Sequence, residues 1–370
     1  MEKVNLFKEF EKTIERTLKE FSKDSLMGLE NLSNANNNNN KIIEDYDSEI
    51  IEELVKMNIP FYNLPLEYGG YELGEEIKIM ILKQLGIFSG SSSFVSILNT
   101  FTILLMADDK EFIKKQMHIV QEKAMYSEVI GLKDEINREL ILQKDDEYIV
   151  TSDEVYVTNF NNIHSFIFII DEEVYMVPKE RKGINFNIDK KSSDDYLVNV
   201  KLDNLLIYKD DRIGQGNIDI NLAITFARLH QASYLLGLAI GALNEAIDYT
   251  NRRRQFQKKL IENQSISFKL ASLLTDLHAI DLKIDKTTWC LENKLDNVLQ
   301  SATEDLAYIS ELALLISREA LHLHGAYGMT KYSKIEKFYR LIGVESVRFG
   351  TPNSLWLSSG KLIINNKELS

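Results

Sequence analysis

The stretch LAITFARLHQASYLLGLAIGALNEAI, residues 222–247, carries the pattern that decides the fold of this chain. Its apolar positions recur at alternating intervals of four and three, with a single hydroxyl interruption. They are Leu222, Phe226, Leu229, Ser233, Leu236, Ile240, Leu243 and Ile247. This spacing places them along one face of a helix that packs lengthwise against other helices. The stretch therefore predicts one long helix of a bundle.

Two later segments repeat the pattern. The first contains Ile266, Leu270, Leu273, Leu277, Ile280 and Ile284, and the second contains Leu306, Ile309, Ala313, Ile316, Ala320 and Leu323. Three long helices with such a stripe, and a fourth helix near the C-terminus, are typical of an antiparallel four-helix bundle. We expect this bundle to span residues 218–370.

The preceding segments have a different character. The runs EYIVTSDEVYVTNF, SFIFII, EVYMV and YLVNVKLDNLLIY are rich in β-branched and aromatic residues and are separated by turn residues. They predict an antiparallel β domain, a barrel or sandwich, over residues 123–217. Residues 1–122 have a helical pattern, interrupted by the polyasparagine tract NLSNANNNNNK, which we interpret as a disordered loop. The predicted fold class is α+β, with an N-terminal helical domain, a central antiparallel β domain and a C-terminal four-helix bundle.

Composition limits the classes of partner. The chain has 370 residues and a formal net charge of −13, which argues against nucleic acid as a partner. Its single cysteine, Cys290, permits no internal disulfide and fits a reducing compartment. No apolar run approaches the roughly 18 residues that span a bilayer, and the N-terminus is too charged for a signal peptide. We therefore expect a soluble cytoplasmic protein without a membrane partner.

Common catalytic and metal motifs are missing from the sequence. The six histidines form no H-x-x-x-H or HExxH grouping, so no metal site is predicted. There is also no G-x-S-x-G elbow, no Walker loop and no G-x-G-x-x-G after a strand. Any catalytic or binding residues must therefore lie in segments without these motifs.

Two segments of the bundle region suggest a ligand. In NRRRQFQKKLIENQ, residues 251–264, five cations occur within eight residues: Arg252, Arg253, Arg254, Lys258 and Lys259. Such a cluster suits a phosphate or pyrophosphate, although basic residues also stabilise the C-terminus of a helix. In LHGAYGMT, residues 323–330, Gly325 and Gly328 are expected to end a helix and to expose backbone amides.

A third segment, VESVRFGTPNSLW at residues 344–356, places a turn inside a helical region. Gly350 and Pro352 break a helix here, and Thr351 between them supplies a hydroxyl. Such a turn is a common place for a catalytic group. The residues that lead into it are instead Arg348 and Phe349.

Together these segments resemble the acyl-CoA dehydrogenase family. RRQFQKKLIENQ is similar to its R-x-Q-F-G-x-x-I-x-x-x-Q signature, LHGAYGMTKYSKIEKFYR to its glycine-rich stretch, and RFGTPNSL to its Glu-Gly-Thr turn. Weaker similarities are IPFYNLPLEYGG, YSEVIG and VYVTN. The motifs occur in the family's order and cover nearly the whole chain.

The resemblance implies a flavoprotein that binds FAD between the β domain and the bundle, as a homodimer or homotetramer. By position, Ser127 and Thr158 would contact the flavin ring, and Tyr156 would lie against it. The residues expected to come from the neighbouring subunit are Arg253, Gln255, Phe256, Gln264, Gly325 and the backbone around His322. Thr351 and Asn353 would contact the FAD of their own subunit.

The departures from the family pattern concern the reaction itself. The family's catalytic base is normally the glutamate before Gly-Thr, and here that position is Phe349. Some members carry the base on the first bundle helix, where this chain has Ala227 beside Arg228. Gln257 replaces a family glycine in the basic segment, and Lys133 replaces a serine on the substrate side. The resemblance therefore assigns no catalytic base.

Three functions follow from these patterns. The first is an FAD-dependent oxidoreductase acting on an acyl thioester, as a small CoA ester or bound to an acyl carrier protein. In this function the base has moved, and Glu345 and Glu128 are the nearest carboxylates in the sequence. The second is a flavin-dependent monooxygenase on the same scaffold, which needs no carboxylate. The third is a non-catalytic relative that serves as a binding or scaffold protein. Because losing a positioned base typically costs a factor of about 10² to 10⁴, we expect ordinary dehydrogenation to be slow.

Overall fold

The computed structural model describes residues 12, 13, 16, 51–88, 92–130, 141–144, 147–158, 160–187, 197–214, 216–330 and 332–366. The polyasparagine tract and Lys133 lie outside these residues. The chain divides into two compact units. The bundle unit contains the described residues within Met1–Glu20, Gly74–Gly90 and Arg228–Ser370, and the sheet unit contains those within Phe21–Leu73 and Ser91–Ala227. The bounds of the three predicted domains remain predictions.

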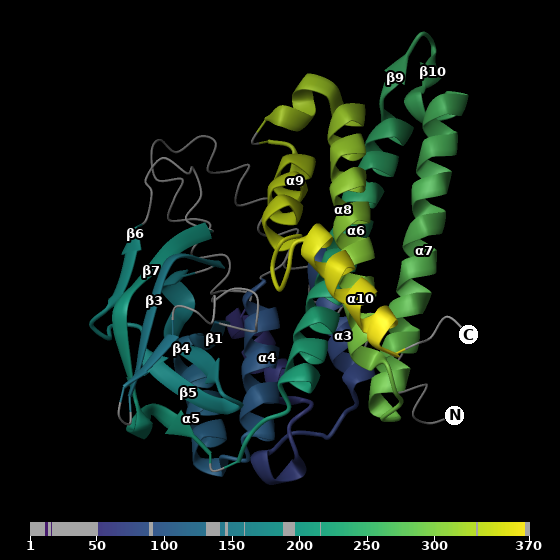
Figure 1. Cartoon of the computed structure of the whole chain (residues 1–370). Coiled ribbons are helices and arrows are strands. Elements are labelled where there is room, and N and C mark those ends of the chain that lie inside the picture. The colour runs from purple at the N-terminus through teal and green to yellow at the C-terminus, as the bar shows by residue number, and fades with distance from the viewer. Residues whose placement is uncertain are drawn as a thin grey trace. The chain divides into compact units, whose positions relative to one another are not determined.

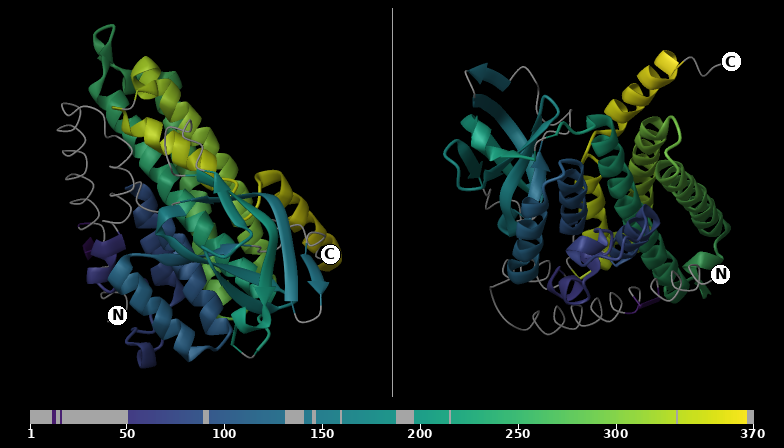
Figure 2. Two further views of the ribbon diagram at one scale, coloured as in Figure 1. Left: turned by 90° about the vertical axis from the view of Figure 1, so that its left-hand side faces the viewer. Right: turned by 90° about the horizontal axis from the view of Figure 1, so that it is seen from below.

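Long helices build the bundle unit (Figure 1). They are α3 (Glu75–Ile87), the bundle-unit part of α6 (Ile220–Arg252), α7 (Gln264–Glu292), α8 (Val298–His324), α9 (Lys334–Glu345) and α10 (Pro352–Asn366). Helices α7 and α8 run alongside each other, and α9 and α10 both pack on α8 (Figures 1 and 2). The central residues of the three predicted stripes are buried, among them Leu236, Leu277 and Ile309. The prediction of long packed helices is confirmed.

A pair of glycines brings α3 close to α6 within the bundle unit. A Cβ atom on Gly86 would lie 2.3 Å from the carbonyl oxygen of Tyr234, and one on Gly237 would lie 2.1 Å from that of Lys83. Any larger side chain would push the two backbones apart. The glycines therefore fix α3 against the middle of α6.

Two four-stranded sheets form the centre of the sheet unit, together with helices α4 (Ser93–Met106) and α5 (Lys110–Lys123). One sheet has the strand order β1 (Tyr126–Ile130), β4 (Ile163–Ile170), β5 (Glu173–Pro178) and β8 (Arg212–Ile213). The other has the order β2 (Ile141–Lys144), β3 (Glu147–Thr158), β7 (Leu197–Tyr208) and β6 (Ile184–Asn187). Helix α4, which is buried from Ser93 to Leu104, packs on β1, and α5 leads into β1.

The strand directions differ from the prediction at one pair. Strand β1 pairs with β4 in parallel, with Ser127 opposite Ser165, whereas the other pairs of the two sheets are antiparallel. The reason is connectivity. The chain leaves β1 and forms β2 and β3 in the other sheet before it returns to β4. Such a crossover allows parallel pairing, which a tight hairpin does not.

No helix in the described part of the chain combines the length and the apolar character that crossing a bilayer requires.

Candidate cofactor site

The basic segment forms a short hairpin after α6. Strand β9 (Arg254–Gln255) pairs antiparallel with β10 (Lys258–Lys259). The turn residues Phe256 and Gln257 have φ angles of 49° and 66°. A two-residue turn with both φ angles positive matches the twist of a hairpin, although glycine or asparagine is the usual occupant. The turn thus keeps this geometry with Gln257 in place of glycine, and it presents Phe256 at its tip, 94% exposed.

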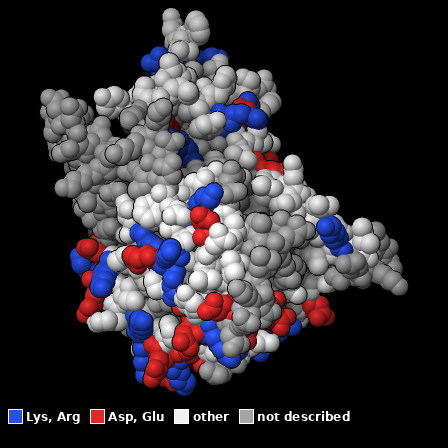
Figure 3. All heavy atoms as spheres, turned by 60° about the vertical axis from the view of Figure 1, so that its left-hand side comes forward, with Lys and Arg blue, Asp and Glu red and all other residues white. Residues whose placement is uncertain are grey.

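The cations of the hairpin are available for a ligand. Among the residues that the structure describes, no ion pair within 4.0 Å is formed by Arg253, Arg254 or Lys258. The Lys259 ammonium donates to the side-chain oxygen of Asn251 at 2.9 Å. On the molecular face shown in Figure 3, acidic and basic side chains are interspersed. A run of unmatched guanidinium groups suits the bidentate binding of phosphate oxygens.

An aromatic contact joins the C-terminal end of α6 to that of α8. The ring of Tyr249 stacks on the ring of His324, with 4.2 Å between centroids. The Nδ1 proton of His324 is donated to the carbonyl oxygen of Ala320 at 2.8 Å, and burial lowers the pKa of His324, so the ring is neutral at pH 7. Gly325 follows with φ of 61° and open space beside its Cα. The stack therefore brings the basic hairpin and Gly325 to the same end of the bundle unit.

Other predicted residues lie at that end or at the start of α10. Gln264 begins α7 directly after the hairpin, and the side chain of His322 is exposed on the last turn of α8. Thr351 precedes α10, and its Oγ1 accepts the backbone N–H of Ser354 at 3.3 Å. Pro352 begins α10 instead of only interrupting the previous helix, as its fixed φ permits. Thr351 and Asn353 are both exposed.

In the sheet unit, Ser127 is completely buried on β1. Its hydroxyl lies 3.0 Å from Gln116 Oε1, 2.7 Å from Ser165 Oγ and 3.2 Å from His164 Nε2. The pKa of His164 is lowered to about 4, chiefly by burial, so its ring is neutral at pH 7. The Ser127 hydroxyl therefore has its partners inside the protein.

Tyr156 and Thr158 lie two residues apart on β3 and so on one face of that strand. The side chain of Tyr156 is 56% exposed, whereas that of Thr158 is buried with its Oγ1 3.4 Å from Ser92 Oγ. Tyr156 thus offers an exposed ring, as expected for a residue that lies against a flat ligand.

The residue at the expected base position is buried. Phe349 has a φ of 60° and is only 5% exposed. The guanidinium carbon of Arg348 lies 5.2 Å from the centroid of its ring. The alternative base position, Ala227 on α6, is also buried. Neither side chain can accept a proton.

Next to Phe349 lies a buried polar cluster around Glu345, one of the two carboxylates considered for a displaced base. Its partners Gln231 and Arg348 were not identified from the sequence. Glu345 is completely buried at the end of α9. The Gln231 amide donates to the carbonyl oxygen and to the carboxylate of Glu345, both at 2.9 Å. Arg348 Nη1 lies 3.7 Å from the same carboxylate. The spacing of Glu345 and Arg348, three residues apart, was the only signal in the sequence.

A second missed cluster holds α3 on α6. The Glu75 carboxylate contacts His230 Nε2 and lies 2.9 Å from Lys78 Nζ, and the three side chains are buried. Burial alone would raise the pKa of Glu75, but Lys78 and His230 lower it to about 2. This carboxylate is therefore charged at pH 7 and has a structural role.

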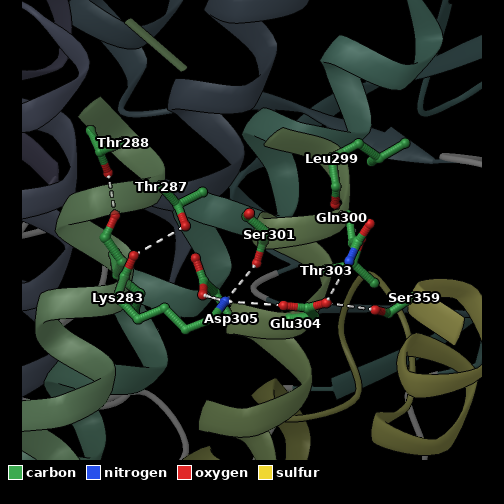
Figure 4. A network of polar contacts seen from close by, with 11 residues as sticks. Lys283, Thr287, Thr288, Leu299, Gln300, Ser301, Thr303, Glu304, Asp305 and Ser359 are labelled. Carbon is green, nitrogen blue, oxygen red and sulfur yellow. Dashed lines mark hydrogen bonds and ion pairs between the residues drawn. The ribbon is translucent and has the colours of Figure 1, made fainter. Parts of the chain in front are cut away.

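A third missed cluster joins α7, α8 and α10 (Figure 4). The Lys283 ammonium contacts the buried Asp305 carboxylate and lies 3.5 Å from Glu304 Oε2. Glu304 Oε1 accepts from Gln300 at 3.0 Å and from Ser359 at 2.9 Å. Burial raises the pKa of Asp305, and Lys283 opposes that shift.

Comparison with known proteins identifies the class. Residues 214–362 match the family model described as "Acyl-CoA dehydrogenase, C-terminal domain". A 3-(aryl)acrylate reductase of Clostridium sporogenes is 25% identical over 83% of this chain and 88% of its own length. The caffeyl-CoA reductase-Etf complex subunit CarC of Acetobacterium woodii is 34% identical over 50% of this chain and 48% of its own.

The fold is similar to that of a solved family member. The butyryl-CoA dehydrogenase structure from Megasphaera elsdenii matches with a TM-score of 0.73 and 16% identity, over 95% of this chain and 98% of that one. The α–β–α fold predicted from the sequence is thereby confirmed. The match over residues 214–362 and the relatives that align with most of the chain support an acyl-CoA dehydrogenase family member.

Proposed function

We propose that this chain is an FAD-dependent oxidoreductase that acts on acyl thioesters, bound to CoA or to an acyl carrier protein. The observation that carries the proposal is the basic hairpin with its exposed tip. Phe256 is 94% exposed on a turn that follows a run of arginines, and no described carboxylate pairs with Arg253. An exposed ring beside exposed cations suits a ligand that contains both a flat base and a pyrophosphate.

The donor chemistry around the hairpin fits FAD. We assign the pyrophosphate and adenosine to Arg253, Gln255, Phe256 and Gln264 of a neighbouring subunit. Gly325 and the backbone at His322 lie at the same end of the bundle unit, and the open space at Gly325 permits a close approach of the ligand. The exposed Thr351 and Asn353 at the start of α10 are assigned to the FAD of their own subunit.

In the sheet unit, the contact that we assign to each residue depends on how exposed its side chain is. We assign the exposed ring of Tyr156 to stacking against the flavin, and Thr158 to a hydrogen bond beside it. Because the Ser127 hydroxyl has partners in Gln116, Ser165 and His164, its contact to the cofactor is assigned to the backbone.

The missing base affects proton transfer at the α-carbon, in whichever direction the reaction runs. Bound flavin supplies a hydride acceptor, or a hydride donor when reduced, for the β-carbon of the thioester. Removal of a proton from the α-carbon is the step that Phe349 and Ala227 cannot assist. The relatives in C. sporogenes and A. woodii are both named reductases. Their names support an unsaturated acyl thioester as the substrate, with a proton delivered to the α-carbon from solvent.

The test is anaerobic mixing of the FAD-loaded protein with thioesters, followed by flavin absorbance. The reduced protein should be reoxidised by α,β-unsaturated thioesters faster than the oxidised protein is bleached by their saturated counterparts. A protein that binds FAD but responds to neither set would be a non-catalytic relative and would contradict the proposal. Oxygen consumption by the reduced protein that depends on an added substrate would favour a monooxygenase instead.

A further inference from the structure

Two opposite charges are fixed beside Phe349 at the end of α9. The helix ends at Glu345, and the chain continues in a tighter turn, in which the Arg348 N–H donates to the Glu345 carbonyl oxygen at 3.3 Å. This turn brings the two side chains together, with Arg348 Nη1 3.7 Å from the Glu345 carboxylate. The guanidinium carbon of Arg348 also lies 5.2 Å from the centroid of the Phe349 ring. The pair is neutral as a whole, but its positive group is the one that lies over the ring.

Burial and a third residue hold the pair in this arrangement. Glu345 and Gln231 are completely buried, and the side chain of Arg348 is 11% exposed. The Gln231 amide donates at 2.9 Å both to the Glu345 carboxylate and to its carbonyl oxygen. The negative group of the pair is thus anchored to α6. Because little water surrounds these charges to screen them, their electric field is strong at position 349.

The reaction of the proposed function forms an anion, and the present inference rests on that function. When a hydride from reduced flavin adds to the β-carbon of an α,β-unsaturated thioester, the electron pair of the double bond moves toward the α-carbon and the carbonyl oxygen. The product is an enolate, which then takes a proton from solvent at its α-carbon. The reverse reaction passes through the same enolate. A group that stabilises the enolate therefore assists both directions.

We propose that Arg348 stabilises this enolate, and that Glu345 and Gln231 are positioning residues that hold its guanidinium in place. Position 349 is where the family pattern leads us to expect a carboxylate. This chain has a neutral ring there, with a guanidinium over it. The local charge is therefore opposite in sign to that of a base. It cannot take a proton from the α-carbon, but it attracts the negative charge that develops on the thioester.

A thioester that forms a stable enolate measures this stabilisation without turnover. Acetoacetyl-CoA is bound to the FAD-loaded protein, and the absorbance of its enolate is followed as the pH is raised. The native protein should favour the enolate about 100-fold more than Arg348→Met does, so that the variant forms it at a pH about two units higher. Arg348→Lys should give an intermediate curve, because it keeps a charge but loses the planar group. Identical curves for the native protein and Arg348→Met would overturn the proposal.

The matched control is Arg340→Met. Arg340 belongs to α9, and its Nε atom lies 2.6 Å from the Glu336 carboxylate, so this variant breaks another ion pair of an arginine with a glutamate of the same helix. Its enolate curve should match that of the native protein. A shift as large as that of Arg348→Met would mean that the effect is not specific to Arg348, and the assignment would be wrong.

Glu345→Gln distinguishes positioning from charge. If the carboxylate holds the guanidinium in place, its loss should weaken enolate formation, in the same direction as Arg348→Met. If it only adds a negative charge near the substrate, its loss should instead strengthen enolate formation. An unchanged or strengthened enolate would show that Glu345 is not a positioning residue. The visible absorbance of each variant confirms that FAD is still bound.

Hydride transfer provides the second readout. Crotonyl-CoA and cinnamoyl-CoA should reoxidise the reduced native protein about 100-fold faster than reduced Arg348→Met, with little change in the thioester concentration that gives half of the maximal rate. An effect on the rate alone is expected for a contact made with the enolate and not with the bound thioester. A native protein that reacts with neither would contradict the proposed function itself. A native protein that reacts no faster than Arg348→Met would contradict only the role of Arg348.

Discussion

The guanidinium of Arg348 lies over the ring of Phe349, 5.2 Å from its centroid, and its Nη1 atom lies 3.7 Å from the buried Glu345 carboxylate. Phe349 is thus packed beneath a cation that already has a carboxylate partner. At the position where the family pattern leads us to expect a base, this chain has an apolar ring in a filled environment. That relationship determines what a restored base should do.

Phe349→Glu should raise the rate at which saturated acyl thioesters bleach the flavin, and it should also lower the melting temperature. The new carboxylate is buried near Arg348, which Glu345 already engages, so its desolvation is incompletely compensated. We expect a stability loss of about 1 to 3 kcal/mol. Stopped-flow absorbance and calorimetry measure the two effects.

Phe349→Leu is the control for that experiment. It removes the ring without adding a proton acceptor, so it should lose stability without gaining rate. If the leucine and glutamate variants bleach equally slowly, position 349 does not face the reacting carbon.

Arg253→Ala should weaken FAD binding by about 10- to 100-fold, because a hydrogen bond to a charged group contributes about 1.5 to 3 kcal/mol. The melting temperature of the apoprotein should not change, since Arg253 is exposed on the hairpin. Arg318→Ala on α8 is the matched control, because Arg318 is also an exposed arginine of the bundle unit. Equal FAD affinities of the two variants would remove the hairpin from the site.

His164 should make the protein less stable in acid. Its pKa is lowered to about 4 in the folded chain, below the ordinary value of 6.5. Between these values the unfolded chain binds a proton that the folded chain does not, so the free energy of unfolding falls as the pH decreases. The slope reaches at most about 1.4 kcal/mol per pH unit.

Replacing His164 tests that contribution. His164→Gln should reduce the loss of stability between pH 6.5 and 4, as measured by urea unfolding at several pH values. His322→Gln, at an exposed histidine, serves as the control and should leave the slope as it is in the native protein. A native slope in the His164→Gln variant would show that this ring does not control the pH dependence.

The Lys283–Asp305 contact gives a prediction about the bundle. Lys283→Met should cost about 3 kcal/mol, because it leaves the completely buried Asp305 carboxylate without its ammonium partner. Adding Asp305→Asn to that variant should recover part of the loss, since the second change removes the buried charge. A double-mutant cycle measured by urea unfolding gives the coupling. Additive losses would mean that the two groups do not stabilise each other.

Local sequence patterns were enough to predict the three long bundle helices and four of the ten described strands, β3, β4, β5 and β7. The apolar stripe through Leu236 lies within one continuous stretch of sequence, and so does the run SFIFII that forms most of β4. Patterns within one stretch can be recognised from the sequence alone. The parallel pairing of β1 with β4 was not predicted, because pairing depends on how the chain crosses between sheets. A run of strand-forming residues does not indicate which other strand it will pair with.

The candidate site was predictable where a motif lies on contiguous residues. The basic segment around Phe256 and the helix end at Gly325 are examples, although the hairpin that the basic segment forms was not predicted. The Glu345–Gln231 and Lys283–Asp305 clusters join segments far apart in sequence, so only the folded chain reveals them. The contacts of the Ser127 hydroxyl with Gln116 and His164 also join residues far apart in sequence, so the sequence did not reveal them. Because of these contacts, we assign the contact of Ser127 with FAD to its backbone.

The central claim is that the chain binds FAD with the hairpin of a neighbouring subunit. The most direct measurement is a titration of the full-length protein with FAD, followed by visible absorbance and by sedimentation of the same samples. The account predicts a yellow protein that saturates at one FAD per chain and sediments as a dimer or larger assembly. A colourless protein that does not bind added FAD, or a monomer that holds FAD tightly, would contradict it.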